Sequence, residues 1–297
     1  MNISILPVCD HASLLGEGPV WDANKQSILW IDIVSCCIHE YNPAKASLYT
    51  IPTVSMPGAI ALRDNGQLVA ALQNGFAFIN RHTGQQHLIH DPEVHLLANR
   101  FNDGKCDPLG RFWAGTMSLN EQDPSGSMYI LDSHLQTRQV FHGVTISNGL
   151  CWNSDGSMMY YIDSPTRRVD RFDMVPDRAQ LSNRSTIIRI GENEGFPDGM
   201  TIDAEGMLWI AHWGGWQISR WNPETGEKLT AIHLPASQIT SLSFGGEQFD
   251  EIYVTSARRG LDEMQLSEEP WAGCTFCIKN SGYKGLPPHT FTHSNDA

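Results

Sequence analysis

The run Ser27-Ile-Leu-Trp-Ile-Asp32 is rich in the β-branched and aromatic residues that favour a strand, and similar runs recur along the chain. The other five are Gln67-Leu-Val-Ala-Ala71, Arg111-Phe-Trp-Ala-Gly115, Met158-Met-Tyr-Tyr-Ile-Asp163, Met207-Leu-Trp-Ile-Ala211 and Glu251-Ile-Tyr-Val-Thr255. Their central residues, from Trp30 to Tyr253, are separated by roughly 40–48 residues, a period typical of β-propeller blades. The repeat therefore indicates a ring of similar β units.

Further short segments complete each unit around its central run. A turn rich in Asp, Asn and Gly precedes most runs, as at Asp64-Asn-Gly66, and a third strand-like run follows, as at Ile218-Ser-Arg-Trp-Asn222. A weaker outer strand closes the unit, no long window has helical periodicity, and six units fill residues 16–285. We predict an all-β, single-domain protein over residues 1–297, a six-bladed β-propeller with four-stranded antiparallel blades.

An all-β sandwich with coincidental spacing is the alternative fold, and six units in register argue against it. Residues 3–8, Ile-Ser-Ile-Leu-Pro-Val, have the pattern of one more strand. We expect this strand to complete the last blade and latch the ring, which leaves no free sheet edge.

Composition excludes several partners. The 297 residues include 20 Lys and Arg against 33 Asp and Glu, a formal net charge of −13, which argues against binding to nucleic acid. No apolar run approaches the ~18 residues that a membrane span needs. Because the N-terminus lacks a basic segment followed by a long apolar stretch, we expect a cytoplasmic protein with no membrane partner, either a monomer or a weak homo-oligomer.

Seven irregularly spaced cysteines are interpreted as reduced and mostly buried thiols. Cys274-Thr-Phe-Cys277 has the spacing of a redox or zinc site, but no second Cys or His pair accompanies it. A lone pair within a strand-like run is a weak indication of such a site.

One repeat position has unusual chemistry: a residue followed by glycine stands just before the first strand of most blades, and four of the five such residues carry a carboxylate or amide. The pairs are Glu17-Gly18, Pro57-Gly58, Asp103-Gly104, Asn148-Gly149 and Asp198-Gly199, with Thr240-Ser241 in the sixth unit. Equivalent positions of a propeller converge on the central channel, so these carboxylates and amides predict a ring of oxygen donors suited to a divalent cation. Glycine there would leave the backbone unhindered near a ligand. The alternative is a simple turn before each strand, although Glu17 is no turn former.

Two further segments are candidates for contact with a ligand. Arg100 and Asn102, at the start of the third blade, could bind the hydroxyl groups of a polar ligand or merely cap a loop. His212 could line the channel or be structural. The tryptophans in the repeats are expected to pack between blades: Trp113, Trp152 and Trp209.

Several motifs, in order, resemble the gluconolactonase/regucalcin (senescence marker protein) family over nearly the whole chain. They are Leu15-Gly-Glu-Gly-Pro-Val-Trp21, Asn99-Arg-Phe-Asn-Asp-Gly-Lys105, Gly115-Thr-Met117, Ser147-Asn-Gly-Leu150 and Pro197-Asp-Gly-Met200. Ala211-His-Trp-Gly-Gly215 and Thr255-Ser-Ala-Arg-Arg-Gly-Leu261 look closest to the bacterial xylono-, arabino- and galactonolactonases.

The resemblance implies a six-bladed propeller that binds one divalent metal ion, Ca²⁺, Zn²⁺, Mn²⁺ or Fe²⁺, through Glu17, Asn148 and Asp198. It also implies that Asp198 acts as the catalytic general base and that Arg100 and Asn102 contact the substrate.

The loop after Gly-Thr-Met departs from the pattern of family members that carry a substrate-binding glutamate there. The aligned position is Asn120, and Glu121 follows one residue later, so either residue could make the sugar contact. Asp103 is expected behind the metal ligands or on the substrate side.

The function that the resemblance implies is metal-dependent hydrolysis of a sugar (aldono-) lactone to its acid, with a small-molecule lactone as the partner. Two alternatives are a propeller phosphotriesterase or broad-specificity lactonase, and a non-catalytic, metal-binding regucalcin-like protein. A metal ion in the channel would polarise P=O and C=O bonds alike, so the first alternative follows from the same ligands.

Overall fold

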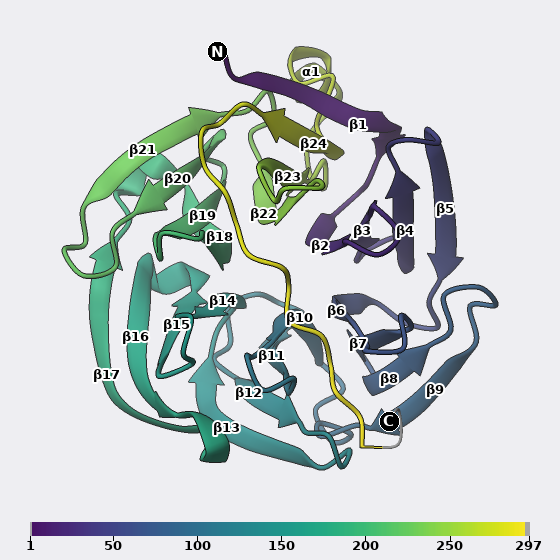
Figure 1. Cartoon of the computed structure of the whole chain (residues 1–297), viewed down its shortest axis with the longest axis vertical. Helices are drawn as coiled ribbons and strands as arrows, with labels where there is room; N and C mark the ends of the chain where they lie inside the picture. The colour runs from purple at the N-terminus through teal and green to yellow at the C-terminus, as the bar shows by residue number, and fades with distance from the viewer. Residues whose placement is uncertain (1, 295–297) are drawn as a thin grey trace.

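The computed structural model describes residues 2–294 and contains six four-stranded antiparallel sheets around a central channel (Figure 1). Blades 1 to 3 consist of β2–β5 (Gly16–Asp22, Ser27–Asp32, Cys37–Asn42, Ser47–Pro52), β6–β9 (Pro57–Leu62, Leu68–Leu72, Gly75–Ile79, Gln86–His90) and β10–β13 (Asn99–Cys106, Phe112–Ser118, Gly126–Leu131, Thr137–Val144). Blades 4 and 5 consist of β14–β17 (Ser147–Trp152, Met158–Asp163, Arg168–Val175, Gln180–Arg189) and β18–β21 (Phe196–Ile202, Leu208–Trp213, Gln217–Trp221, Lys228–His233). The six-bladed propeller is confirmed, and the six recurring runs are the second strands of the blades.

Blade 6 joins the two ends of the chain. Its inner strands are β22 (Ile239–Gly245), β23 (Glu251–Ser256) and β24 (Cys274–Lys279), and its outer strand is β1 (Ser4–Ala12), which pairs antiparallel with β24. The prediction that the N-terminal strand latches the ring is confirmed. The innermost strands of neighbouring blades contact each other all round the channel, including β2 against β22.

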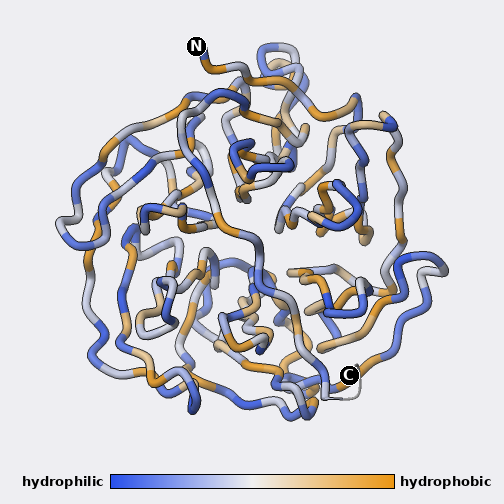
Figure 2. Tube along the Cα trace, in the orientation of Figure 1, coloured by the Kyte–Doolittle hydropathy of each residue, from blue (hydrophilic) through white to orange (hydrophobic). Residues whose placement is uncertain are grey.

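Apolar side chains fill the spaces between blades, and several inner strands are buried on both faces while many outer connections are hydrophilic (Figure 2). Trp113 of blade 3 lies edge-on against Trp152 of blade 4, with ring centroids 5.5 Å apart. Trp209 of blade 5 meets Phe244 of blade 6 in the same way at 6.0 Å. These contacts confirm that the repeated tryptophans pack between blades.

The X–Gly pairs lie inside the innermost strands rather than before them, which corrects the sequence prediction. Each innermost strand shifts its pairing register at this position, for example between Glu17 and Val20 in β2 and between Pro197 and Met200 in β18. A β-bulge re-aims the neighbouring side chain. The X–Gly pairs look like turns in the sequence because a β-bulge, like a turn, favours glycine for its conformational freedom.

In blades 2, 4 and 5, glycine at this position makes room for the innermost strand of the next blade. A Cβ on Gly149 would lie 2.5 Å from Cβ of Met200, and a Cβ on Gly199 would lie 2.2 Å from Oγ of Ser241. In both cases the obstructing atom belongs to the innermost strand of the following blade. Glycine therefore lets adjacent innermost strands approach closely around the channel.

A C-terminal strap, residues 280–294, crosses one face of the ring over the channel (Figure 1). The backbone N–H of Phe291 donates to the carbonyl of Leu62 at 2.7 Å, and the N–H of Thr292 donates to Gly110 at 3.0 Å. Phe291 is fully buried in the cluster of apolar side chains between blades 2 and 3. The strap thus ties blade 6 to the opposite side of the ring.

The remaining features are small. The helix α1 (Glu263–Glu268) lies between β23 and β24, and no helix among residues 2–294 has the length and apolar run that a membrane crossing requires. All seven cysteines are free thiols. Cys274 and Cys277 are three positions apart on β24, so their side chains point to opposite sides of the strand and do not form one site.

Candidate metal and substrate site

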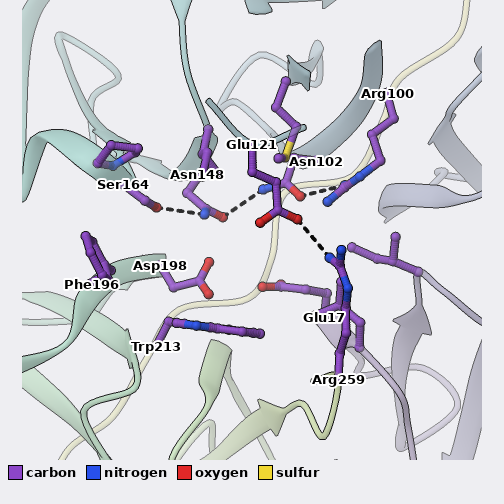
Figure 3. Close-up of a pocket in the computed structure, with 15 residues that line it drawn as sticks. Glu17, Arg100, Asn102, Glu121, Asn148, Ser164, Phe196, Asp198, Trp213 and Arg259 are labelled. Atoms are coloured by element: carbon purple, nitrogen blue, oxygen red, sulfur yellow. Dashed lines mark hydrogen bonds and ion pairs between the residues drawn. The ribbon is translucent and has the colours of Figure 1, made fainter. Parts of the chain in front are cut away.

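A cavity of about 340 Å³ opens at one end of the channel, where the innermost strands begin (Figure 3). Its walls combine buried polar groups with apolar side chains. The apolar lining residues are Leu15, Ile33, Met117, Ile146, Pro165, Phe196 and Trp213. A concave, mostly apolar pocket with a few convergent polar groups is the usual form of a small-molecule site.

Three oxygen-bearing side chains lie at this end of the channel, each at the bulge of an innermost strand. Glu17 comes from β2, Asn148 from β14 and Asp198 from β18, and all three line the cavity. Their residue exposures are 6%, 4% and 7%, so burial holds the two carboxylates away from bulk water. The blade repeat therefore brings together residues that are up to 181 positions apart in sequence, from Glu17 to Asp198.

The electrostatics of this group require a cation or a proton. Burial, together with the charge of Asp103, raises the pKa of Glu17 to about 8. Burial and the charges of Glu17 and Asp103 raise the pKa of Asp198 well above its usual value. Among residues 2–294, no ion pair neutralises Glu17 or Asp198. Two buried carboxylates and an amide oxygen that face one cavity fit a divalent cation.

Hydrogen bonds fix the orientation of Asn148. Its Nδ2 donates to the hydroxyl of Ser164 at 2.8 Å, and that hydroxyl donates to the carbonyl oxygen of Pro197 at 2.6 Å. Its Oδ1 accepts from Nδ2 of Asn102 at 3.2 Å. Because Ser164 can accept only from the amide nitrogen, the oxygen of Asn148 is turned away from Ser164 and towards the centre of the site (Figure 3).

Arg100 and Asn102, both on β10, lie beside this group and line the cavity. The Nη1 of Arg100 donates to Oδ1 of Asn102 at 2.7 Å and to the carbonyl of Phe101 at 3.0 Å. Burial lowers the pKa of Arg100 to about 10, so the guanidinium remains charged at neutral pH. Within residues 2–294, these bonds leave Nε and Nη2 of Arg100 for a ligand.

The amide of Asn102 is already engaged by protein groups. Its Nδ2 also donates to the carbonyl of Ser147 at 2.7 Å, so both amide hydrogens are used. Asn102 therefore positions Arg100 and Asn148, and only the second lone pair of its Oδ1 is open to a substrate.

Asp103 points away from this cavity and lines a second one, of about 160 Å³, further along the channel. Its Oδ1 accepts the N–H of Gly104 at 2.7 Å. Strap residues 286–289 line the second cavity. The strands β2, β10, β14 and β18 each run from the first cavity to the second, so the second cavity lies further along the channel. Asp103 acts on Glu17 and Asp198 through its charge, from behind them.

The loop after β11 brings Glu121, and not Asn120, to the cavity. Oε1 of Glu121 pairs with Nη1 of Arg259 at 2.8 Å, and both side chains line the mouth (Figure 3). Glu121 has a positive φ of 61°, which turns the chain so that its side chain points inwards. Asn120 instead closes its own turn, with Nδ2 donating to Asp123 at 2.6 Å.

Residues 15–258 match the family model described as SMP-30/Gluconolactonase/LRE-like region. The chain belongs to this family.

Relatives of this SMP-30/gluconolactonase-like protein extend along almost its whole length. Regucalcin of Danio rerio is 37% identical over 294 residues, covering 98% of this chain and 99% of the relative. A putative sugar lactone lactonase of Bacillus subtilis is 33% identical and covers 94% and 96% of the two chains. The crystal structure of regucalcin from Agrobacterium tumefaciens, described as a calcium-binding protein, has a TM-score of 0.91 at 27% identity, with 96% of each chain covered. Membership supports lactone hydrolysis as the general reaction of the family.

The structure of this family member also shows the role of His212. It adds two lining residues, Ser164 and Arg259, that were not predicted from the sequence. His212 is fully buried, its Nδ1 donates to the carbonyl of Glu194 at 2.8 Å, and burial lowers its pKa to about 4, so its role is structural. Arg259 lies in a family-like motif and could have been selected from it. Ser164 follows the second strand of blade 4 and carries no signal in the sequence.

Proposed function

We propose that this protein hydrolyses a sugar lactone with the help of one divalent metal ion held by Glu17, Asn148 and Asp198. The observation that carries the proposal is the convergence of these three buried oxygen donors with Arg100 in a single cavity. Family membership and the similarity to the putative sugar lactone lactonase of Bacillus subtilis support lactone hydrolysis over other reactions. The all-oxygen donor set favours Ca²⁺, Mg²⁺ or Mn²⁺, and it also accepts Zn²⁺ or Fe²⁺.

When bound, the metal ion would act as a Lewis acid on the lactone carbonyl and neutralise the two carboxylates. Asp198 then has the role of general base: it accepts a proton from the attacking water as the new C–O bond forms at the carbonyl carbon. The ring C–O bond breaks, and the same proton passes to the departing ring oxygen, giving the open hydroxy acid. A metal-bound carboxylate is a weak base, so Asp198 acts mainly through its position.

The other residues of the cavity orient the lactone. Arg100 offers the donors that Asn102 leaves free, and these suit the hydroxyl or carbonyl oxygens of a sugar. Glu121 and Arg259 present an acceptor and a donor at the mouth for hydroxyl groups further from the reacting carbonyl. Trp213 and Phe196 form an apolar wall that limits access of bulk water.

The test is to measure initial rates on glucono-, galactono-, arabino- and xylonolactone with metal-depleted protein and after adding back single metals. Each rate is corrected for spontaneous lactone opening. We expect activity only with metal, and a loss of at least about 10³-fold in Asp198→Ala, because this change removes a ligand and the base together.

Two outcomes would overturn the proposal. Full activity of the metal-depleted protein would exclude the metal mechanism, and metal binding without acceleration over spontaneous opening would favour a non-catalytic regucalcin-like protein. Organophosphate triesters belong in the same panel, because faster turnover of those substrates would favour a phosphotriesterase.

A further inference from the structure

A cluster of metal-binding side chains lies away from the channel, where the N-terminal strand passes from blade 6 to blade 1 (Figure 1). We call it the seam cluster and define it as His11, Asp32, Cys37 and His39. One ligand atom from each of His11, Asp32 and His39 lies within 4.8 Å of the other two. Nothing in the proposed reaction uses these residues.

The backbone places the blade 1 members on one face of the sheet. Asp32 on β3 is paired directly with Cys37 on β4, and Trp30 is paired with His39. Cys37 and His39 are two positions apart on a strand, so their side chains point the same way. Both are buried, with exposures of 8% and 2%.

His11 approaches the same face from β1. The pairing of β1 with β24 shifts register between Pro7 and Ala12, which removes His11 from the regular ladder. Its ring lies 4.1 Å from the ring of His39, centroid to centroid. The Nε2 of His11 is buried and has no hydrogen-bond partner among residues 2–294. Burying a ring nitrogen without a partner is unfavourable unless a ligand makes a hydrogen bond to it or a metal ion binds it.

The spacing of the other donors suits a tetrahedral ion. Sγ of Cys37 lies 3.4 Å from Nε2 of His39. Two such ligands on one Zn²⁺ ion are about 3.5 Å apart, given Zn–S and Zn–N lengths of about 2.3 and 2.0 Å. The Nδ1 of His39 makes a hydrogen bond with the hydroxyl of Thr50 at 2.9 Å, which fixes the ring. Its Nε2 makes a hydrogen bond with the thiol of Cys37, and a metal ion bound by both atoms would replace that thiol proton.

Asp32 supplies negative charge to the cluster while holding the turn before β2. Its carboxylate accepts the N–H groups of Leu14, Leu15 and Ser35 and the hydroxyl of Ser35. With a thiolate at Cys37, one divalent ion would be electrically neutralised. Imidazole and thiolate ligands select zinc-like ions rather than Ca²⁺ or Mg²⁺.

We propose that the seam cluster is a second metal site, which binds a zinc-like divalent ion through His11, Asp32 and His39 with the thiol of Cys37, beside His39, as the fourth donor, and fastens the N-terminal strand to blade 1. Binding releases the thiol proton of Cys37 to solvent. The proposal is independent of lactone hydrolysis.

The test is a Co²⁺ titration of reduced Asp198→Ala protein, in which the channel site has lost a ligand. We expect one equivalent to bind with tetrahedral visible bands and a near-ultraviolet thiolate-to-cobalt band, and Zn²⁺ to displace it. Cys37→Ser should abolish the thiolate band, and His11→Gln should weaken binding at least about tenfold. Cys36→Ser, one residue away, and His87→Ala, on the exposed strand β9, should leave the titration unchanged.

Folding of each variant is checked by circular dichroism, and thermal unfolding gives a second readout. Zn²⁺ should raise Tm of Asp198→Ala protein and fail to raise Tm of the double variant with His11→Gln. Absence of the thiolate band in Asp198→Ala protein would overturn the proposal, as would a titration equally sensitive to Cys36→Ser.

Discussion

Glu121 of blade 3 and Arg259 of blade 6 form an ion pair across the mouth of the cavity, with 2.8 Å between Oε1 and Nη1. Blades 3 and 6 stand opposite each other in the ring, so this contact spans the opening rather than joining neighbours. Both side chains are substantially exposed, at 42% and 48%. An exposed ion pair contributes little to stability, so the pair can break at small cost when a substrate binds to either side chain.

Exchange of this pair for sugar hydroxyl groups predicts a change in KM. We expect Glu121→Gln to lower kcat/KM about three- to tenfold, mainly through KM, because a hydrogen bond of about 0.5–1.5 kcal/mol is lost. Asn120→Ala is the matched control and should be neutral, since Asn120 bonds only within its own turn. Steady-state kinetics of both variants on the best lactone test this prediction. A larger loss of kcat/KM in Asn120→Ala than in Glu121→Gln would show that Asn120, and not Glu121, contacts the sugar.

The hydroxyl of Ser164 predicts a tuning effect on metal affinity. Ser164→Ala removes the acceptor that holds Nδ2 of Asn148, so the amide loses its fixed orientation. Loss of such a supporting bond typically costs about 10–100-fold in metal affinity. Isothermal titration of metal into the variant measures this, with Ser182→Ala on the exposed strand β17 as control. Unchanged affinity in Ser164→Ala would exclude Asn148 as a ligand.

The raised pKa of Glu17 predicts how the stability of the metal-free protein depends on pH. Folding raises this pKa from 4.5 to about 8, so between these values the folded state holds a proton that the unfolded state has lost. Stability from this group is therefore present at low pH and falls as pH rises, by up to about 1.4 kcal/mol per pH unit.

Added metal should reverse that loss, so the increase in Tm on metal addition should grow from about pH 5 to pH 8. Glu17→Gln removes the titrating group and should flatten the dependence of the metal-free protein. Differential scanning fluorimetry over this range, with chelator and with metal, measures both effects. A metal-free wild type whose stability has the same pH profile as Glu17→Gln would contradict the prediction.

The strap depends on one buried aromatic side chain. Phe291→Ala should destabilise the protein by about 3–5 kcal/mol and release the strap, because the ring is fully buried between blades 2 and 3. Leu286→Ala lies on the same segment with 47% exposure and should change stability little. Chemical denaturation and limited proteolysis at residues 280–294 measure the two effects, and equal resistance of both variants would refute the anchoring role.

The architecture was predictable because a propeller repeats its local chemistry. Trp30, Trp113 and Trp209 occupy the same position in blades 1, 3 and 5, since each blade must bury the same face against its neighbour. The convergence of Glu17, Asn148 and Asp198 followed from the same symmetry. The bulges could not be predicted, because a turn and a bulge both favour glycine.

Contacts made by residues outside the repeated positions of the blades could not be predicted from the sequence either. Nothing local to Ser164 indicates that it supports Asn148. The motif that contains Arg259 singles that residue out but does not show that it faces Glu121. The choice between Asn120 and Glu121 depended on a backbone angle, which sequence spacing does not determine. The approach of His11 to His39 arises from ring closure, where residues far from any repeat meet.

The pairing of β1 with β24 has a consequence for synthesis of the chain in the cell. The strand β1 is synthesised before blades 1 to 5 and its partner β24 after them, as Ser4 meets Lys279. Blade 6 can close only after β24 has been synthesised, and the segment Ser4–Ala12 must wait without its partner until then. Release of a shortened product that ends before β24 would leave an unpaired strand, which makes premature termination a route to aggregation.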